Sequence, residues 1–123
     1  MRVDTAHSQI IVTAGPFNLP AMDPYMDMSE MDKTPNEVMR FDWPVQGYMR
    51  GFSVVVRDAA GDTLPPDVLH HLIGVNFDRR QLVYPAVERL FGWGAETSPV
   101  VLPSSLGVPL HMGEHLGMYA MFH

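Results

Sequence analysis

Prolines occur throughout this chain of 123 residues, at eleven positions between 16 and 109. A proline inside an α-helix removes a hydrogen bond and clashes with the preceding turn, so this spacing excludes long helices over most of the sequence. Between the prolines lie short runs of β-branched and aromatic residues, a pattern typical of strands joined by turns. The sequence therefore predicts an all-β protein, an antiparallel β-sandwich with a jelly-roll-like arrangement.

Five segments are expected to form strands because they are rich in β-branched and aromatic residues and end near turn residues. They are residues 9–13, 49–58, 68–76, 100–102 and 116–123. One short helical excursion is expected over 86–91, since Pro85 suits a first helical position and Gly92 suits a helix end. Residues 20–42 have neither period, hold six acidic and two basic residues, and are expected to form a long methionine-rich loop or arm.

Composition excludes several classes of protein. The formal charge of −6 argues against nucleic-acid binding, which needs a basic face. No apolar run approaches the ~18 residues of a membrane-spanning helix, and no apolar leader segment follows Met1. The absence of cysteine excludes disulfides, zinc ribbons and thiol catalysis. The mass of 13.8 kDa predicts a single domain over residues 1–123.

Two adjacent histidines, His70 and His71, lie within the otherwise apolar predicted strand 68–76. Successive strand residues point to opposite faces, so both rings can reach one site only if a bulge or local twist turns them. A third imidazole, from His123 at the end of the predicted strand 116–123, would complete a three-nitrogen site suited to copper or zinc. The alternative is one buried, hydrogen-bonded histidine beside one exposed histidine.

The sequence of residues 68–73, VLHHLI, resembles the His-His strand of the copper type II, ascorbate-dependent monooxygenases. This family includes peptidylglycine α-hydroxylating monooxygenase and dopamine β-hydroxylase. Residues 113–123 are similar to the later strand that delivers the family's third histidine. The resemblance covers roughly residues 45–123 and implies that His70, His71 and His123 bind one copper ion in a β-sandwich domain that relays electrons.

The chain departs from that family in two respects. It lacks the family's disulfide cysteines, and it has no counterpart of the second domain, whose copper reacts with oxygen. The resemblance therefore implies a copper-binding domain without a complete monooxygenase site, which needs an electron donor or a second copper domain as partner. We expect the chain to be a fragment of a longer protein in the bacterial periplasm or outside the cell.

Weaker ligand candidates lie elsewhere in the sequence. Met26 and Met28 belong to the methionine-rich arm, where thioethers can select Cu(I) or simply cover apolar surface. Met121 shares a predicted strand face with His123, although core packing also explains it. His111 and His115 flank a glycine in a predicted turn, and solvent exposure accounts for both.

Two further functions are compatible with these features. The chain could be a non-catalytic β-sandwich interaction module whose histidines are buried, or a copper carrier that uses the methionine-rich arm. The apolar strand expected over 116–123 has no polar cap, and an open strand edge favours pairing with another chain. A homo-oligomer formed through this C-terminal strand edge is therefore also expected.

Overall fold

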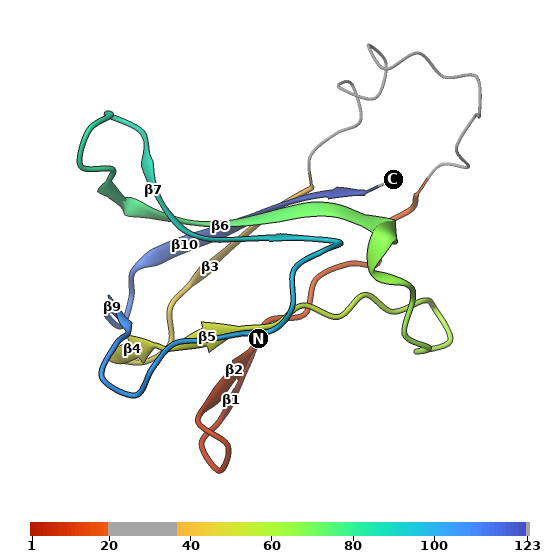
Figure 1. The fold of residues 1–123 in the computed structure, drawn as a ribbon, viewed down its shortest axis with the longest axis horizontal. Helices are drawn as coiled ribbons and strands as arrows, with labels where there is room; N and C mark the ends of the chain where they lie inside the picture. Colours follow the sequence, from red (N-terminus) through yellow and green to blue (C-terminus); the bar gives the residue numbers. More distant parts are fainter. Residues whose placement is uncertain (20–36, 123) are drawn as a thin grey trace.

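The computed structural model describes residues 1–19 and 37–122 (Figure 1). In these residues the regular elements are strands, apart from one short 3-10 turn, η1 (Pro66–Val68). The strands are β1 (Arg2–Asp4), β2 (Gln9–Ile11), β3 (Glu37–Asp42), β4 (Gly47–Met49), β5 (Gly51–Phe52), β6 (Leu69–Arg80), β7 (Val87–Gly94), β8 (Val100–Val101), β9 (Val108–Leu110) and β10 (His115–Phe122). Every strand pairing among them is antiparallel, which confirms the predicted all-β antiparallel class.

The largest sheet has four strands in the order β3-β10-β6-β7. Its longest strand, β6, has 12 residues and is an inner strand, with β10 on one side and β7 on the other. Figure 1 shows β6 running along the whole sheet, from η1 at one end to the β6–β7 hairpin at the other. The predicted strand 68–76 is therefore present and extends four residues further.

The core lies on one face of this sheet. Leu72, Trp93 and Ala120 are directly opposite one another on β6, β7 and β10, and all three are buried. Phe52 and the residues that follow it pack against this row, and the Phe52 ring stacks on Phe91 with 4.5 Å between ring centroids. The segment from Phe52 to Val56 therefore lies against this face of the sheet. The short ladders β4–β9 and β5–β8 form separate two-stranded sheets, and the sandwich and jelly-roll arrangement remains a prediction.

Gly74 permits the close approach of β7 to the middle of β6. Gly74 pairs with Phe91, and a Cβ atom at Gly74 would overlap the Phe91 ring. Only glycine leaves room for an aromatic ring lying directly across the backbone. The Phe91 ring stacks on Phe52, and both rings pack against the core cluster that contains Trp93.

The helix predicted over residues 86–91 is wrong, because this segment forms the first part of β7. Phe91 and Trp93 are two residues apart, so both point to the core face, opposite Gly74 and Leu72 of β6. The burial of both rings outweighs the local preference for a helix. A helix here would also have been very short, and helices of that length are marginal without tertiary packing.

The predicted strand 49–58 is also only partly correct. It is divided into β4 and β5, and the residues after Phe52 continue without a strand partner until the isolated pairing of Arg57 with Thr63. The chain changes partner at Arg50, from β9 to β8, and the Arg50 carbonyl accepts a hydrogen bond from Leu102 N–H. Within this segment Phe52, Val54 and Val56 pack against the core, so their side chains are partly buried without a continuous backbone ladder.

Two predictions about sheet edges require correction. Residues 37–42, assigned to the arm, form β3, which pairs with β10 from Glu37 opposite Ala120 to Asp42 opposite His115. The remainder of that arm, residues 20–36, lies outside the described residues. Because β10 lies between β3 and β6, the open C-terminal edge expected to support a homo-oligomer is occupied within this chain.

Candidate functional site

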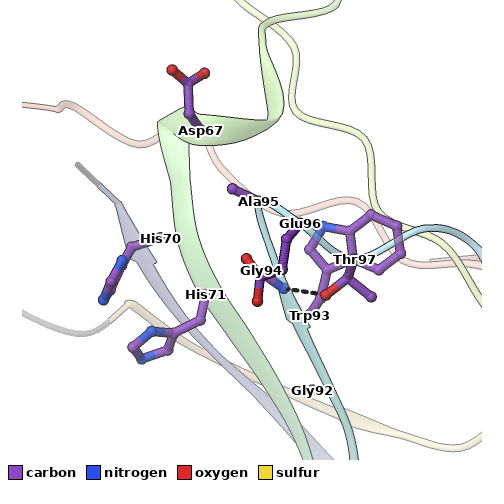
Figure 2. A pocket seen from close by; sticks show the side chains of 9 residues that line it. All are labelled: Asp67, His70, His71, Gly92, Trp93, Gly94, Ala95, Glu96 and Thr97. Atoms are coloured by element: carbon purple, nitrogen blue, oxygen red, sulfur yellow. Dashed lines mark hydrogen bonds between the residues drawn. The ribbon is translucent and has the colours of Figure 1, made fainter.

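A β-bulge at the start of β6 places His70 and His71 together. In the pairing of β10 with β6, Met121 is opposite His71 but Phe122 is opposite Leu69, so His70 is an extra residue on β6. A bulge of this kind re-aims the side chains on the bulged strand. The two imidazole centroids are 4.6 Å apart with 48° between the ring planes, and Figure 2 shows both rings on the same side of β6.

The two histidines differ from their apolar neighbours in exposure. Leu69 and Leu72 on either side are buried, whereas His70 is exposed and His71 is half-buried. The strand is thus an inner strand, as expected, yet its first residues present a polar surface. The simpler alternative predicted one buried and one exposed histidine; His70 is exposed, but His71 is only half-buried and its ring lies on the same side of β6 (Figure 2).

His71 has a different kind of neighbour on each flanking strand. Its cross-strand partner on β10 is Met121, and its partner on β7 is Gly94. Cβ atoms of directly opposite residues are about 4.5–5.5 Å apart, so the Met121 side chain lies beside that of His71. A Cβ atom on Gly94 would lie 3.0 Å from both carboxylate oxygens of Glu96, so this carboxylate covers the backbone opposite His71.

A tight turn after β7 holds Glu96 in this position. Gly94 N–H donates to Thr97 Oγ1, and Thr97 N–H donates to the Gly94 carbonyl, both at 2.9 Å. The turn, η1 and the histidines line an open pocket of about 590 Å3. Its other acidic residue, Asp67, lies on η1, and Figure 2 shows its carboxylate pointing away from the two rings.

The described residues contain part of the predicted metal site. They include no group of three or more His, Cys, Asp or Glu side chains that could hold a metal ion. The His70 and His71 rings lie side by side, and Met121 is the strand partner of His71. The third predicted ligand, His123, lies outside the described residues, as do Met26 and Met28.

The weaker candidates His111 and His115 belong to the opposite end of the sheet. His115 is the first residue of β10, and Met121 lies six residues later, about 20 Å along an extended strand. The His115 ring contacts Asp78 with 2.9 Å between Nδ1 and Oδ1, and His115 N–H donates to Asp78 Oδ2 at 2.8 Å. These contacts lower the pKa of Asp78, and the hydrogen bond to Asp78 raises the pKa of His115.

His111 lies in the turn before β10, as expected, and its ring contacts Gln46 with 3.0 Å between Nδ1 and Oε1. Its backbone N–H donates to Glu114, which also accepts two hydrogen bonds from the Arg79 guanidinium at 2.6 and 2.8 Å. Burial acts to raise the pKa of Glu114, but the His111 N–H and Arg79 outweigh it and hold this pKa below its ordinary value. The structure therefore assigns these groups to an ion-pair network remote from His70.

Glu96 and Gly94 were not identified as site residues from the sequence. Their relation to His71 depends on the pairing of β7 with β6, in a segment for which the sequence predicted a helix. A histidine pair followed by an acidic residue more than twenty positions later carries no local signal. Only the strand register makes them neighbours.

No protein-family model, curated protein or solved structure matches this chain. In the parts of the chain that the structure describes, no helix is long and apolar enough to cross a membrane.

Proposed function

We propose that this chain binds a single copper ion through His70, His71 and His123 and that the site transfers electrons. The observation that carries the proposal is the bulge at His70, since it brings two imidazoles to one side of a strand that would otherwise point them apart. Imidazole nitrogen suits both oxidation states of copper and also accepts zinc as a substitute.

His123 is proposed as the third ligand because of its place in the sequence. β10 ends at Phe122, whose strand partner is Leu69, the residue before His70. His123 is the next residue of the chain after Phe122. Three nitrogens leave copper with an open position, so the ion can exchange electrons with a reductant or a partner domain.

The flanks of His71 supply groups of opposite character. Met121 offers a soft thioether, which favours Cu(I), while the negative charge of the nearby Glu96 carboxylate favours Cu(II) without making Glu96 a ligand. A site between the two can hold both states without a strong preference, which suits an electron relay. The relationship to the copper monooxygenases, and a location in the periplasm or outside the cell, form part of the same proposal.

The proposal is tested by titrating the chain separately with Cu(II) and, under anaerobic conditions, with Cu(I) against a competing chelator. We expect one ion per chain and a loss of affinity of at least about 100-fold in His70→Ala, His71→Ala and His123→Ala. His7→Ala and His111→Ala are matched controls, because these rings contact Asp4 and Gln46 far from the bulge. Each control should retain the wild-type affinity.

Two results would contradict the proposal. Equal losses in all five histidine variants would indicate adventitious surface binding, and no stoichiometric binding of either ion would exclude a copper site. Met121→Leu keeps the volume of the side chain and removes only the sulfur donor. It should weaken Cu(I) binding more than Cu(II) binding, and the reverse order would exclude the thioether from the site.

A further inference from the structure

The β6–β7 hairpin ends in an apolar tip that the fold does not use. Leu82, Val83 and Tyr84 are consecutive, and these residues are 101, 77 and 66% exposed. Figure 1 shows this loop extending beyond the sheet at the end opposite η1. Single exposed apolar residues are ordinary on protein surfaces, but three or more in succession are unfavourable unless they have a function.

The loop geometry does not require apolar residues at these positions. Gln81 N–H donates to the Ala86 carbonyl at 2.9 Å and closes the loop, and the Gln81 side chain donates to the Val87 carbonyl at 3.3 Å. These bonds leave residues 82–85 as the tip. Turns of this kind are usually formed by Gly, Asn, Asp or Ser, whose side chains satisfy the backbone, so the sequence LVYP is unusual there.

Positive charge surrounds the base of the same hairpin. Residues 79–89 contain three arginines and one glutamate, a net charge of +2 within a chain whose formal charge is −6. Arg79 is 3.6 Å from Glu88 and also pairs with Glu114, so its charge is compensated and the positive charge at the hairpin comes from Arg80 and Arg89. A shallow open depression beside Leu82 is lined by Arg80, Arg89, Gln81 and Glu88, so two arginines and one glutamate lie behind the apolar tip.

The base of the hairpin is held firmly enough to present this tip. Arg79 joins β6 to Glu114 in the turn before β10 and to the Pro109 carbonyl on β9. Asp78 joins β6 to His115 on β10. The base of the hairpin is therefore fixed to β9 and β10, and its apolar tip projects into solvent instead of packing against the protein.

We propose that this hairpin tip inserts into the headgroup region of an anionic lipid bilayer. A convex wedge has no cavity of its own to receive a ligand, but it can displace headgroups and bury its apolar side chains at the membrane interface. Tyrosine is favoured at that depth because its ring is apolar and its hydroxyl remains hydrated. Arg80 and Arg89 would then face the anionic headgroups, which gives charge complementarity that the rest of this acidic chain lacks.

The inference does not depend on the copper proposal, because the hairpin and the histidines occupy opposite ends of β6. It is tested by sedimenting the full chain with vesicles of phosphatidylcholine alone and with vesicles containing about one third phosphatidylserine. We expect binding to the second kind of vesicle, with weaker binding to the first and weaker binding at high salt. Leu82→Asp should reduce the partition coefficient by at least about tenfold.

Leu106→Asp is the matched control, because Leu106 is also an exposed leucine, at 56%, but lies in a loop far from the hairpin in sequence. It should leave the partition coefficient unchanged. Arg80→Gln with Arg89→Gln should remove the preference for phosphatidylserine. Tyr84→Trp should give an emission spectrum that shifts to shorter wavelength when vesicles are added, which reports insertion directly.

Three results would overturn the inference. These are no binding of the wild type to either kind of vesicle, an equal loss in Leu82→Asp and Leu106→Asp, and no spectral shift in Tyr84→Trp. Self-association that depends on Leu82 without vesicle binding would assign the tip to a protein contact instead. Because residue 82 makes no core contact, Leu82→Asp should keep the wild-type circular dichroism spectrum and thermal midpoint.

Discussion

The strand pairing of β6 is interrupted by a register shift near each of its ends, and the two shifts have different consequences. At the first end, a register shift beside Met121 makes His70 an extra residue and turns it to the same side as His71. At the second end, a shift between Asn76 and Arg80 releases three residues of β6 from β7, and Arg79 then reaches Glu114 and Glu88. At the first end, the exposed His70 and half-buried His71 follow the buried Leu69. At the second end, the Arg79 ion pair holds the base of the hairpin whose tip, Leu82, is exposed.

The comparison shows that residue type alone does not determine burial at a strand end. Leu69 at the first end is 2% exposed, whereas Leu82, just past the second end, is fully exposed. Leu69 lies on a paired strand and belongs to the core cluster, whereas Leu82 lies in the loop beyond the last paired residue of β6. The following substitutions test this contrast, from the largest expected effect to the smallest.

Replacing Leu69 and Leu82 by alanine should give the largest difference in the free energy of unfolding between the two ends of β6. Leu69→Ala should lower the free energy of unfolding by about 2–5 kcal/mol, because it removes a buried side chain from the core cluster. Leu82→Ala should change it by less than about 0.5 kcal/mol, because the side chain is already in water. Urea denaturation of both variants measures the difference. Comparable losses in the two variants would mean that the hairpin tip packs against the protein.

The ion-pair network should stabilise the second end alone. Glu114→Gln should lower the free energy of unfolding by about 1–3 kcal/mol, because Glu114 is largely buried and accepts charged hydrogen bonds from Arg79. His71→Ala, at the first end, should cost less than this because the ring is only half-buried. If His71→Ala proves the more destabilising change, the histidines have a packing role that the contrast between the two ends does not include.

A matched pair of glycines tests the carboxylate beside His71. Gly94→Ala places a Cβ atom against Glu96 and should displace its carboxylate, whereas a Cβ atom on Gly92 meets nothing within 4 Å. If copper binds as proposed, Gly94→Ala should weaken Cu(II) binding by about threefold to tenfold, the effect of losing a neighbouring group rather than a ligand. Gly92→Ala should bind as the wild type does. Identical Cu(II) affinities in the two variants would remove Glu96 from the site.

The smallest effect concerns pH and the contact between His115 and Asp78. The raised pKa of His115 means that its contribution to stability is complete below its ordinary value of 6.5 and is lost as the pH rises through the raised value. The lowered pKa of Asp78 means that its contribution is present above 3.8 and is lost as the pH falls through the lowered value. His115→Gln should therefore be less stable than the wild type near pH 6, and the gap should narrow near pH 9.

Urea denaturation of the wild type and His115→Gln at both pH values measures this gap. His7→Gln is the control, because its contact with Asp4 lies on the separate β1–β2 hairpin. A gap that widens as the pH rises would show that neutral, not protonated, His115 makes the stabilising contact.

Sequence patterns predicted the strand that carries the histidines with good accuracy, because β6 covers residues 69–76 of the predicted 68–76. Residues 69–76 are dominated by apolar residues, and such a run forms an inner strand whatever its partners are. The prediction of a helix over 86–91 was wrong because the weak local preference for a helix is outweighed by the burial of Phe91 and Trp93 against β6. Local propensity is worth tenths of a kcal/mol per residue, and burial of an aromatic ring is worth several times more.

The candidate site was predictable in its histidines but not in its surroundings. Adjacency of His70 and His71 is a fact of the sequence, and the need for a bulge follows from the alternation of strand side chains. The position of that bulge, the pairing of Met121 with His71 and the approach of Glu96 all depend on the register between strands. Register is fixed by contacts among segments far apart in the chain, which no local pattern encodes.

By itself, the sequence determined the all-β class, because its prolines exclude long helices through local steric and hydrogen-bonding effects. It also determined that no cysteine chemistry occurs and that the chain carries net negative charge. Only the tertiary structure decided that β10 lies between β3 and β6, that the two imidazoles share one side of β6, and that Leu82 projects into solvent. Those outcomes required the free energy of burying one distant segment against another, which exists only once the sheet has formed.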